Sequence, residues 1–384
     1  MNQIIKILLV LSLTLLCACQ STLNSNNQAN NLNSIGNKAE NDQLSSLSFI
    51  HQQGGLIADT FNQDKENAFY RWWDHEHLLS YAHDKYPKLT VTEDETFYRF
   101  VKNKFSNHLK STEMWRFDGI HDDNLVFSTY FVEMPTVILF KYKYIHTGGQ
   151  KKLVITNWKM IHHLTTGLDA YSAYLHNAGI INESGYLDIA QSAIKKTEKT
   201  EDEVATLFNK LPETIRNEPT LLNDFIWSSL AVVKDPSPQF LNQMYQYAPS
   251  LTPENSAFWG YFYMLRNDLV QSQHIHSMAM ANLGYLQTNY ALVGILYSLQ
   301  QQDNEYAFQQ FIKYIKAHPN DAVAYSIYLS NLIDLGLHKR ASQIYRALSL
   351  QFNLKLTPQD FIGIDQEKLS AFFYSEEMKN VWRL

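Results

Sequence analysis

The sequence predicts a mixed α+β unit followed by an all-α region. Three observations carry this prediction. Between residues 112 and 163, four runs rich in Val, Ile, Thr and aromatic residues are separated by turn residues, as in an antiparallel meander. From about Ile180 onward, apolar residues recur at helical spacing. Only 14 of the 384 residues are Gly and 10 are Pro, which favours long helices over a turn-rich all-β fold.

The composition is that of a globular protein with no nucleic-acid partner. Apolar residues make up 45% and aromatic residues 13% of the chain, enough to bury a sizeable core. The formal net charge is −6, and no block of basic residues occurs in the sequence. A nucleic-acid-binding surface needs such a block, so this class of partner is not expected.

The N-terminus has the pattern of an export signal. Lys6 is followed by an apolar core of about ten residues, Ile7 to Leu16, which is too short to span a bilayer. The core ends in Leu16-Cys17-Ala18-Cys19, which resembles the cleavage box of bacterial lipoproteins. The resemblance implies that residues 1–18 are removed and that Cys19 is lipidated. An ordinary signal peptide cleaved nearby is the alternative.

The residue after Cys19 and the segment beyond it suggest where the folded part lies. The residue after Cys19 is Gln20 and not Asp, which implies export to the outer membrane, with the protein facing the periplasm. With Cys17 lost and Cys19 lipidated, the mature chain would contain neither a disulfide nor a free thiol. Residues 20–46 are rich in Asn, Gln and Ser, which predicts a flexible tether spanning roughly 30 Å.

Residues 47–179 are predicted to form the α+β unit. Phe69, Trp72, Trp73 and Leu79 recur at helical spacing, and Glu95–Leu109 is a second amphipathic segment. The predicted strands are Thr112–Ile120, Leu125–Met134, Thr136–Thr147 and Lys152–His163, with turns at 121–124 and 148–150. Aromatic residues alternate with lysines in 140–144, which predicts one packed and one wet sheet face. Two helices followed by such a meander resemble a cystatin-like or NTF2-like cone.

Residues 180–384 are predicted to form helices whose starts are well marked. Ser237, Thr252 and Thr357 each precede a proline, the order of a capping hydroxyl and a proline at the first helical position. Thr200 and Glu203 form a candidate capping box.

A repeated spacing marks the end of the chain. Ala307 and Phe311 recur as Ala341 and Tyr345, with Pro319 and Gly336 in the turns between the helices. Small and large residues at these positions let the second helix of a hairpin pack closely on the first. This 34-residue period resembles that of tetratricopeptide (TPR) repeats over residues 289–353 and is degenerate over 200–288.

The whole arrangement is similar to a family of bacterial TPR-containing lipoproteins of undefined role. For the α+β unit, the likeness is carried by the segment Trp115–Gly167, with Phe127–Phe131 and Leu153–Trp158 inside it. This family has no agreed catalytic residues that could be transferred to the present chain.

Candidate chemical groups in the sequence are few. Asp74-His75-Glu76-His77 is the most metal-like cluster. On a helix, however, side chains two positions apart point about 200° away from each other, so His75 and His77 cannot share one ion. The pairs His162-His163 and His274/His276 are each expected to be partly exposed surface features, and Asp122-Asp123 to be turn residues. No nucleophile elbow, phosphate loop or dinucleotide fingerprint occurs, so we expect neither a cofactor nor an enzyme.

The function predicted from these observations is a membrane-anchored protein-interaction scaffold of the cell envelope. Its partner would be an envelope protein or peptide held on the concave face of the repeats. The alternative is a small-molecule-binding or hydrolytic pocket in the α+β unit, lined by Asp74, His77, His121 and Asn157. A cone filled by Trp72, Trp73 and Phe97 would argue against that pocket. A third possibility is a structural spacer.

Overall fold

The computed structural model describes residues 38–87, 112–131 and 134–382, with gaps at 148, 165, 178–184, 187, 190–191, 193–196, 234–235, 267, 285–287, 355 and 362–363. The predicted lipid site Cys19 and the predicted helix Glu95–Leu109, with its Phe97, lie outside the described residues. None of the helices within the described ranges is both long and apolar enough to cross a membrane.

The first helices differ from the prediction in where they begin and break. Helix α2 (Lys38–Gln63) starts inside the segment predicted to be a tether, because 38–46 contains the helix formers Lys, Ala, Glu, Gln and Leu. The predicted helix through Phe69 and Leu79 is two helices, α3 (Lys65–Trp72) and α4 (His75–Lys85). The break occurs because Trp73 leaves the helix to bridge Ile155, whose carbonyl accepts a 2.9 Å hydrogen bond from the Asp74 N–H.

The predicted antiparallel meander is confirmed. Strands β1 (Thr112–His121), β2 (Asn124–Phe131), β3 (Met134–Thr147) and β4 (Gln150–Met160) form one sheet in the order β1-β2-β3-β4. The predicted turn residues Asp122 and Asp123 connect β1 to β2 with φ angles of 43° and 58°, values that Asp tolerates better than most residues. The chain is therefore α+β first and helical afterwards, as predicted.

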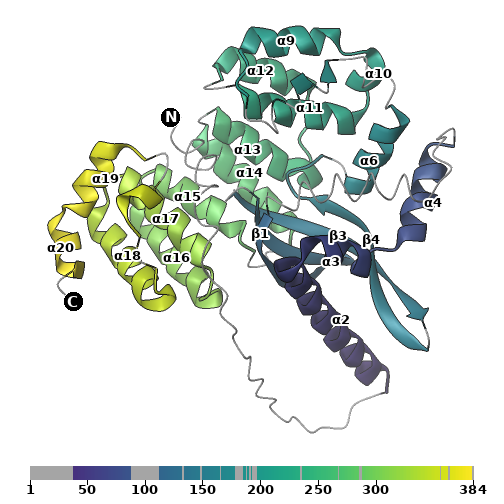
Figure 1. Cartoon of the computed structure of the whole chain (residues 1–384), viewed down its shortest axis with the longest axis horizontal. Helices are drawn as coiled ribbons and strands as arrows, with labels where there is room; N and C mark the ends of the chain where they lie inside the picture. Colours follow the sequence, from purple (N-terminus) through teal and green to yellow (C-terminus); the bar gives the residue numbers. More distant parts are fainter. Residues whose placement is uncertain are drawn as a thin grey trace.

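Both faces of the sheet are covered over most of their length. One face carries α2 and α3, with Phe61, Trp73 and Phe140 in a shared core. On the other face, Val126 and Val137 are fully buried. They pack against three helices of the helical region, α13 (Ser256–Leu265), α14 (Leu269–Asn282) and α15 (Ala291–Gln300) (Figure 1). The predicted solvent-exposed face is confined to the part of the sheet toward the β3–β4 turn, where Lys141 and Lys143 are exposed.

The first helices of the helical region pack above the sheet in Figure 1. They are α6 (Gly167–His176), α9 (Glu201–Lys210), α10 (Glu213–Arg216), α11 (Pro219–Val232), α12 (Pro238–Tyr247), α13 (Ser256–Leu265) and α14 (Leu269–Asn282). The predicted capping box of Thr200 and Glu203 begins α9, and Ser237 caps α12. The prolines after Thr252 and Thr357 instead open single 3₁₀ turns, Pro253–Asn255 and Pro358–Asp360, because an Asn or Asp three residues on closes each turn back on its threonine.

The last helices form consecutive hairpins. They are α15 (Ala291–Gln300), α16 (Asn304–Ala317), α17 (Ala322–Asp334), α18 (His338–Phe352), α19 (Gln366–Phe373) and α20 (Glu376–Trp382). Gly336, with a φ of 71°, turns the chain between α17 and α18, a conformation that favours glycine.

The four residues that mark the repeated spacing occupy equivalent buried positions. Ala307, Phe311 and Ala341 have no exposed surface, and Tyr345 is buried as well. Phe311 stacks on Tyr328 of α17 with ring centroids 3.9 Å apart. These residues therefore pack helices together, as the sequence predicts.

Candidate functional site

Of the four residues predicted to line a pocket, Asp74, His121 and Asn157 each hold a structural element. Asp74 accepts a hydrogen bond from the His77 N–H at the start of α4 and forms an ion pair of 2.5 Å with Lys143. Burial favours the protonated carboxyl, but the contacts from Lys143 and the His77 N–H outweigh it and hold the pKa of Asp74 below its usual value. The pKa of the His77 imidazole is lowered, first by burial and then by Lys143.

Asn157 and His121 act as connectors in two other places. The Asn157 carbonyl oxygen accepts hydrogen bonds from the N–H groups of Trp158 and Leu168, at 2.8 and 3.2 Å, and so fixes the start of α6. His121 Nε2 lies 2.8 Å from the carbonyl oxygen of Asn282 at the end of α14. These contacts account for the polar groups without a substrate.

The sheet face that α2 and α3 cover is filled by aromatic rings. Phe61 stacks on Trp115 at 4.1 Å between centroids, and Trp73 packs edge-on against Trp158 at 5.7 Å. Trp72 and Trp73 are both buried. This sheet face is packed core along these residues, which argues against the predicted pocket.

The histidine pairs differ from the prediction in their burial. His162 and His276 are 4% and 7% exposed, so the expectation that they belong to the surface is wrong for both. His162 lies on Thr136, with Nδ1 2.8 Å from its hydroxyl, and His276 Nε2 donates to the Tyr290 carbonyl at 2.9 Å. Within the described ranges, no group of three or more His, Cys, Asp or Glu side chains could hold a metal ion.

The buried His276 makes the stability of the fold depend on pH. Burial lowers its pKa to about 4, while the unfolded chain keeps a value near 6.5. The unfolded state therefore binds the proton more readily, and stability is lost as the pH falls from about 6.5 to 4, by roughly 3 kcal/mol. We expect His276→Gln to flatten this loss in urea unfolding curves measured across that window. The exposed neighbour supplies the control, and equal slopes for His276→Gln and His274→Gln would contradict the assignment.

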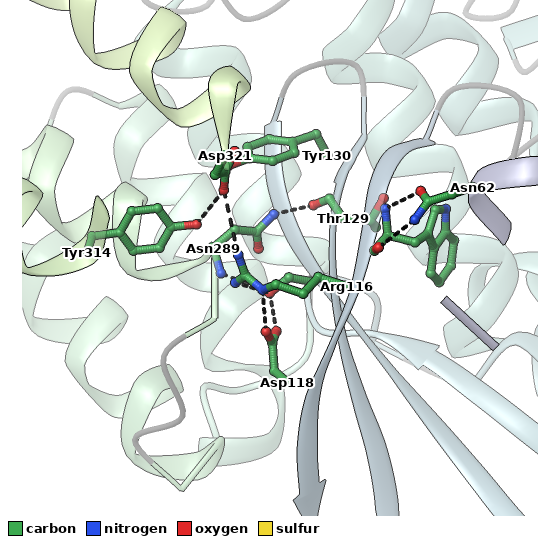
Figure 2. Close-up of polar contacts among 10 residues, drawn as sticks. Asn62, Arg116, Asp118, Thr129, Tyr130, Asn289, Tyr314 and Asp321 are labelled. Carbon is green, nitrogen blue, oxygen red and sulfur yellow. Dashed lines mark hydrogen bonds and ion pairs between the residues drawn. The ribbon is translucent and has the colours of Figure 1, made fainter. Parts of the chain in front are cut away.

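A cluster of buried and partly buried polar side chains joins the sheet to the helical hairpins, and we call it the polar junction (Figure 2). Arg116 and Asp118 project from β1 and pair at 2.6 Å. Asp321, the N-cap of α17, lies 3.7 Å from the Arg116 guanidinium. Tyr130 of β2 and Tyr314 of α16 each donate a 2.7 Å hydrogen bond to the same Asp321 oxygen. One carboxylate therefore connects strands β1 and β2, helix α16 and the start of α17.

A second part of the polar junction lies at the start of α15. The Asn289 N–H donates to the Ser128 hydroxyl at 2.9 Å, and the Asn289 side-chain amide donates to the Thr129 carbonyl. Ser128 in turn donates to Asp118, which links the two parts. Because Ser128 is buried and held on both sides, this arrangement is suited to fixing the sheet on the helices and not to attacking a substrate.

Burial and neighbouring charges together shift the pKa values of four groups in the polar junction. Burial raises the pKa of Asp118, and the contacts from Arg116 and Ser128 offset only part of that rise. Burial and the nearby Asp321 charge raise the pKa values of the Tyr130 and Tyr314 hydroxyls, which stay protonated as donors. Burial disfavours the Arg116 cation, but Asp118 reverses this effect and raises the pKa of Arg116.

The sequence interpretation missed the polar junction, although part of its signal is visible. Arg116 and Asp118 are two apart in a predicted strand and so share one face, where a charged pair is unusual on a packed sheet. Asp321 directly precedes an apolar helical run, which is an N-cap signal. Nothing local indicates that these charges meet.

Comparisons with known proteins give no relative. A scan against protein-family models, a search of curated proteins and a search of solved structures each found no match.

Proposed function

We propose that this chain is a lipid-anchored interaction module of the bacterial cell envelope. It would belong with lipoproteins that join a cystatin- or NTF2-like domain to TPR-like repeats, carry its lipid on Cys19, and face the periplasm from the outer membrane. It would act by binding an envelope protein or peptide, without a cofactor and without catalysis. The supporting observation is the pair of hairpins α15–α16 and α17–α18, in which Ala307 and Phe311 of the first recur as Ala341 and Tyr345 of the second.

The exposure of these hairpins favours one face for the partner. Seven of the ten residues of α15 and nine of the thirteen residues of α17 are buried, so the first helix of each hairpin offers little free surface. Helix α18 instead presents an exposed ridge of Lys339, Gln343, Arg346 and Leu350. Leu350, at the end of this ridge, is 75% exposed. We therefore place the partner on the α18 ridge and not on the predicted concave face.

The pocket alternative has less support. Asp74, His121 and Asn157 each hold a structural element, and His77 contacts Asp74 through its backbone N–H. Aromatic rings fill the sheet face that α2 and α3 cover. A hydrolytic site would need at least two of these groups to converge on a space that a substrate can enter.

The proposal is tested with the full-length chain expressed from its own signal in a Gram-negative host. We expect the wild-type chain to fractionate with the outer membrane and to carry a diacylglyceryl mass on its N-terminal cysteine. Cys19→Ala is expected to move it to the soluble or signal-bearing fraction, since several acyl chains are needed for stable attachment. Wild-type and variant chains with the same fractionation and no lipid mass would overturn the anchor.

The same strain tests the partner face by cross-linking in the envelope. We expect Arg346→Ala/Leu350→Ala to lose the cross-linked products by roughly tenfold or more, the size of a hot-spot effect. Arg216→Ala/Val270→Ala is the matched control, because Arg216 is exposed and Val270 is 72% exposed on other helices. Equal product yields from both double variants would rule out the α18 ridge.

A further inference from the structure

The β3–β4 hairpin carries a concentration of positive charge in an acidic protein. From Met134 to Leu168 the sequence contains five lysines and no Asp or Glu, although the whole chain has a formal charge of −6. Lys143 is paired with Asp74. Lys141, Lys151 and Lys152 are exposed, as is His146 near the turn. We call these three lysines the hairpin cluster.

Aromatic side chains lie against Lys151, whereas Lys152 pairs with Ile145 and so lies on the opposite face of the hairpin. Lys151 Nζ lies 3.8 Å from the centroid of the Tyr144 ring and 5.6 Å from that of Phe49. The half-buried Tyr142 and Tyr144 pack edge-on against each other at 5.8 Å. Amphipathic rings beside lysines are the residue types that suit the boundary between water and lipid headgroups.

The hairpin cluster lies at the end of the molecule where helix α2 begins. Phe49 in the first half of α2 packs on Tyr144, with centroids 6.1 Å apart. Figure 1 shows the start of α2 and the β3–β4 turn at the same lower-right end of the fold. Residues 20–37 separate Cys19 from α2, and a coil of that length spans roughly 20–25 Å. A lipid on Cys19 would therefore keep this end close to the bilayer.

We infer that the β3–β4 hairpin lies on the membrane surface, with Lys141, Lys151 and Lys152 binding anionic phospholipid headgroups. The inference builds on the proposed lipid anchor, which would set the distance. Asn124 pairs with Lys141, so Asp122 and Asp123 of the β1–β2 turn lie beside that lysine and offset its charge. Lys151 and Lys152 therefore carry more of the attraction to the headgroups. Each lysine near an anionic surface strengthens binding by roughly fivefold.

The test measures vesicle flotation of the chain from residue 20, produced without lipid. Its failure is therefore distinguishable from failure of the anchor, which is tested on the full-length chain. The anionic vesicles contain phosphatidylcholine and phosphatidylglycerol in a ratio of roughly two to one, and the neutral vesicles contain phosphatidylcholine alone. We expect binding to the anionic vesicles, binding to the neutral ones weaker by roughly tenfold or more, and release by about 0.5 M NaCl. Equal binding to both vesicle types would overturn the inference.

Variants assign the binding to the hairpin cluster. Lys141→Gln/Lys151→Gln/Lys152→Gln is expected to lose most of the binding to anionic vesicles, while the triple Lys→Arg variant keeps it and shows that the fold is intact. Lys210→Gln/Lys313→Gln/Lys316→Gln changes the net charge equally, at exposed sites on helices α9 and α16, and should bind as wild type. Equal losses in the two glutamine variants would contradict the assignment. The assignment would also be contradicted if the triple Lys→Gln variant of the hairpin cluster bound vesicles normally but lost binding to an acidic protein.

Discussion

Replacing Asp321 with alanine is expected to lower the free energy of unfolding by about 3–5 kcal/mol, the cost of removing one member of a buried charged cluster. Asp321 is 5% exposed, and the change removes the acceptor for Tyr130 and Tyr314 and the carboxylate beside Arg116. It also removes the N-cap of α17, where the Ala324 N–H donates to Asp321 at 3.0 Å. Urea unfolding measures the loss.

The control for Asp321→Ala is the equivalent cap one helix earlier. Asp303 is exposed and caps α16 through the Tyr306 N–H at 3.4 Å. Asp303→Ala should cost about 1 kcal/mol, the usual loss of a cap. Asp321→Asn, which keeps a capping oxygen but removes the charge, should lie between the two. If Asp321→Ala cost no more than Asp303→Ala, the polar junction would contribute nothing to stability.

Replacing Phe311 with alanine is expected to cost about 3–5 kcal/mol, because it leaves a cavity that the neighbouring helices cannot close. Phe311 is fully buried and contacts two aromatic residues of α17, stacking on Tyr328 and meeting Tyr325 edge-on at 5.6 Å. The midpoint of urea unfolding measures the effect.

Two further variants place Phe311→Ala on a scale. Phe311→Leu keeps part of the volume and should lose less than half as much stability. Tyr306→Ala, on the same helix but 49% exposed, should change the free energy of unfolding by no more than about 0.5 kcal/mol. A Phe311→Ala loss as small as that of Tyr306→Ala would show that the repeated spacing does not mark the hairpin core.

Local patterns were enough to predict the strands and the helix starts at Thr200 and Ser237. The turn at Asp122 and Asp123 and the cap at Ser237 depend on residues two or three positions apart, so one sequence contains the full signal. The break between α3 and α4 could not be predicted, because it depends on the pairing of Trp73 with Ile155, 82 positions away in the chain. The start of α2 at Lys38 was missed because an Asn- and Ser-rich composition hid its helix formers.

The candidate site was harder to predict than the fold. The pattern at 74–77 suggested a metal and pocket chemistry, yet Asp74 is a helix cap and an ion-pair partner. The polar junction went unnoticed since its members are far apart in the sequence. Tyr130 and Asp321, which share a hydrogen bond, are separated by 191 positions.

The sequence by itself determined the order of the elements, the meander and the packing role of Ala307, Phe311, Ala341 and Tyr345. It could do so because side-chain periodicity and capping act over a few residues. Only the tertiary structure decided what covers each apolar face. Alternation in the sequence places Val126 and Val137 on one face of a sheet. It does not indicate that helices α13 to α15 cover that face. The meeting of the buried Asp321 with the partly buried Arg116 and Asp118 was decided in the same way, since a charge is stable inside a protein only where the fold brings a partner to it.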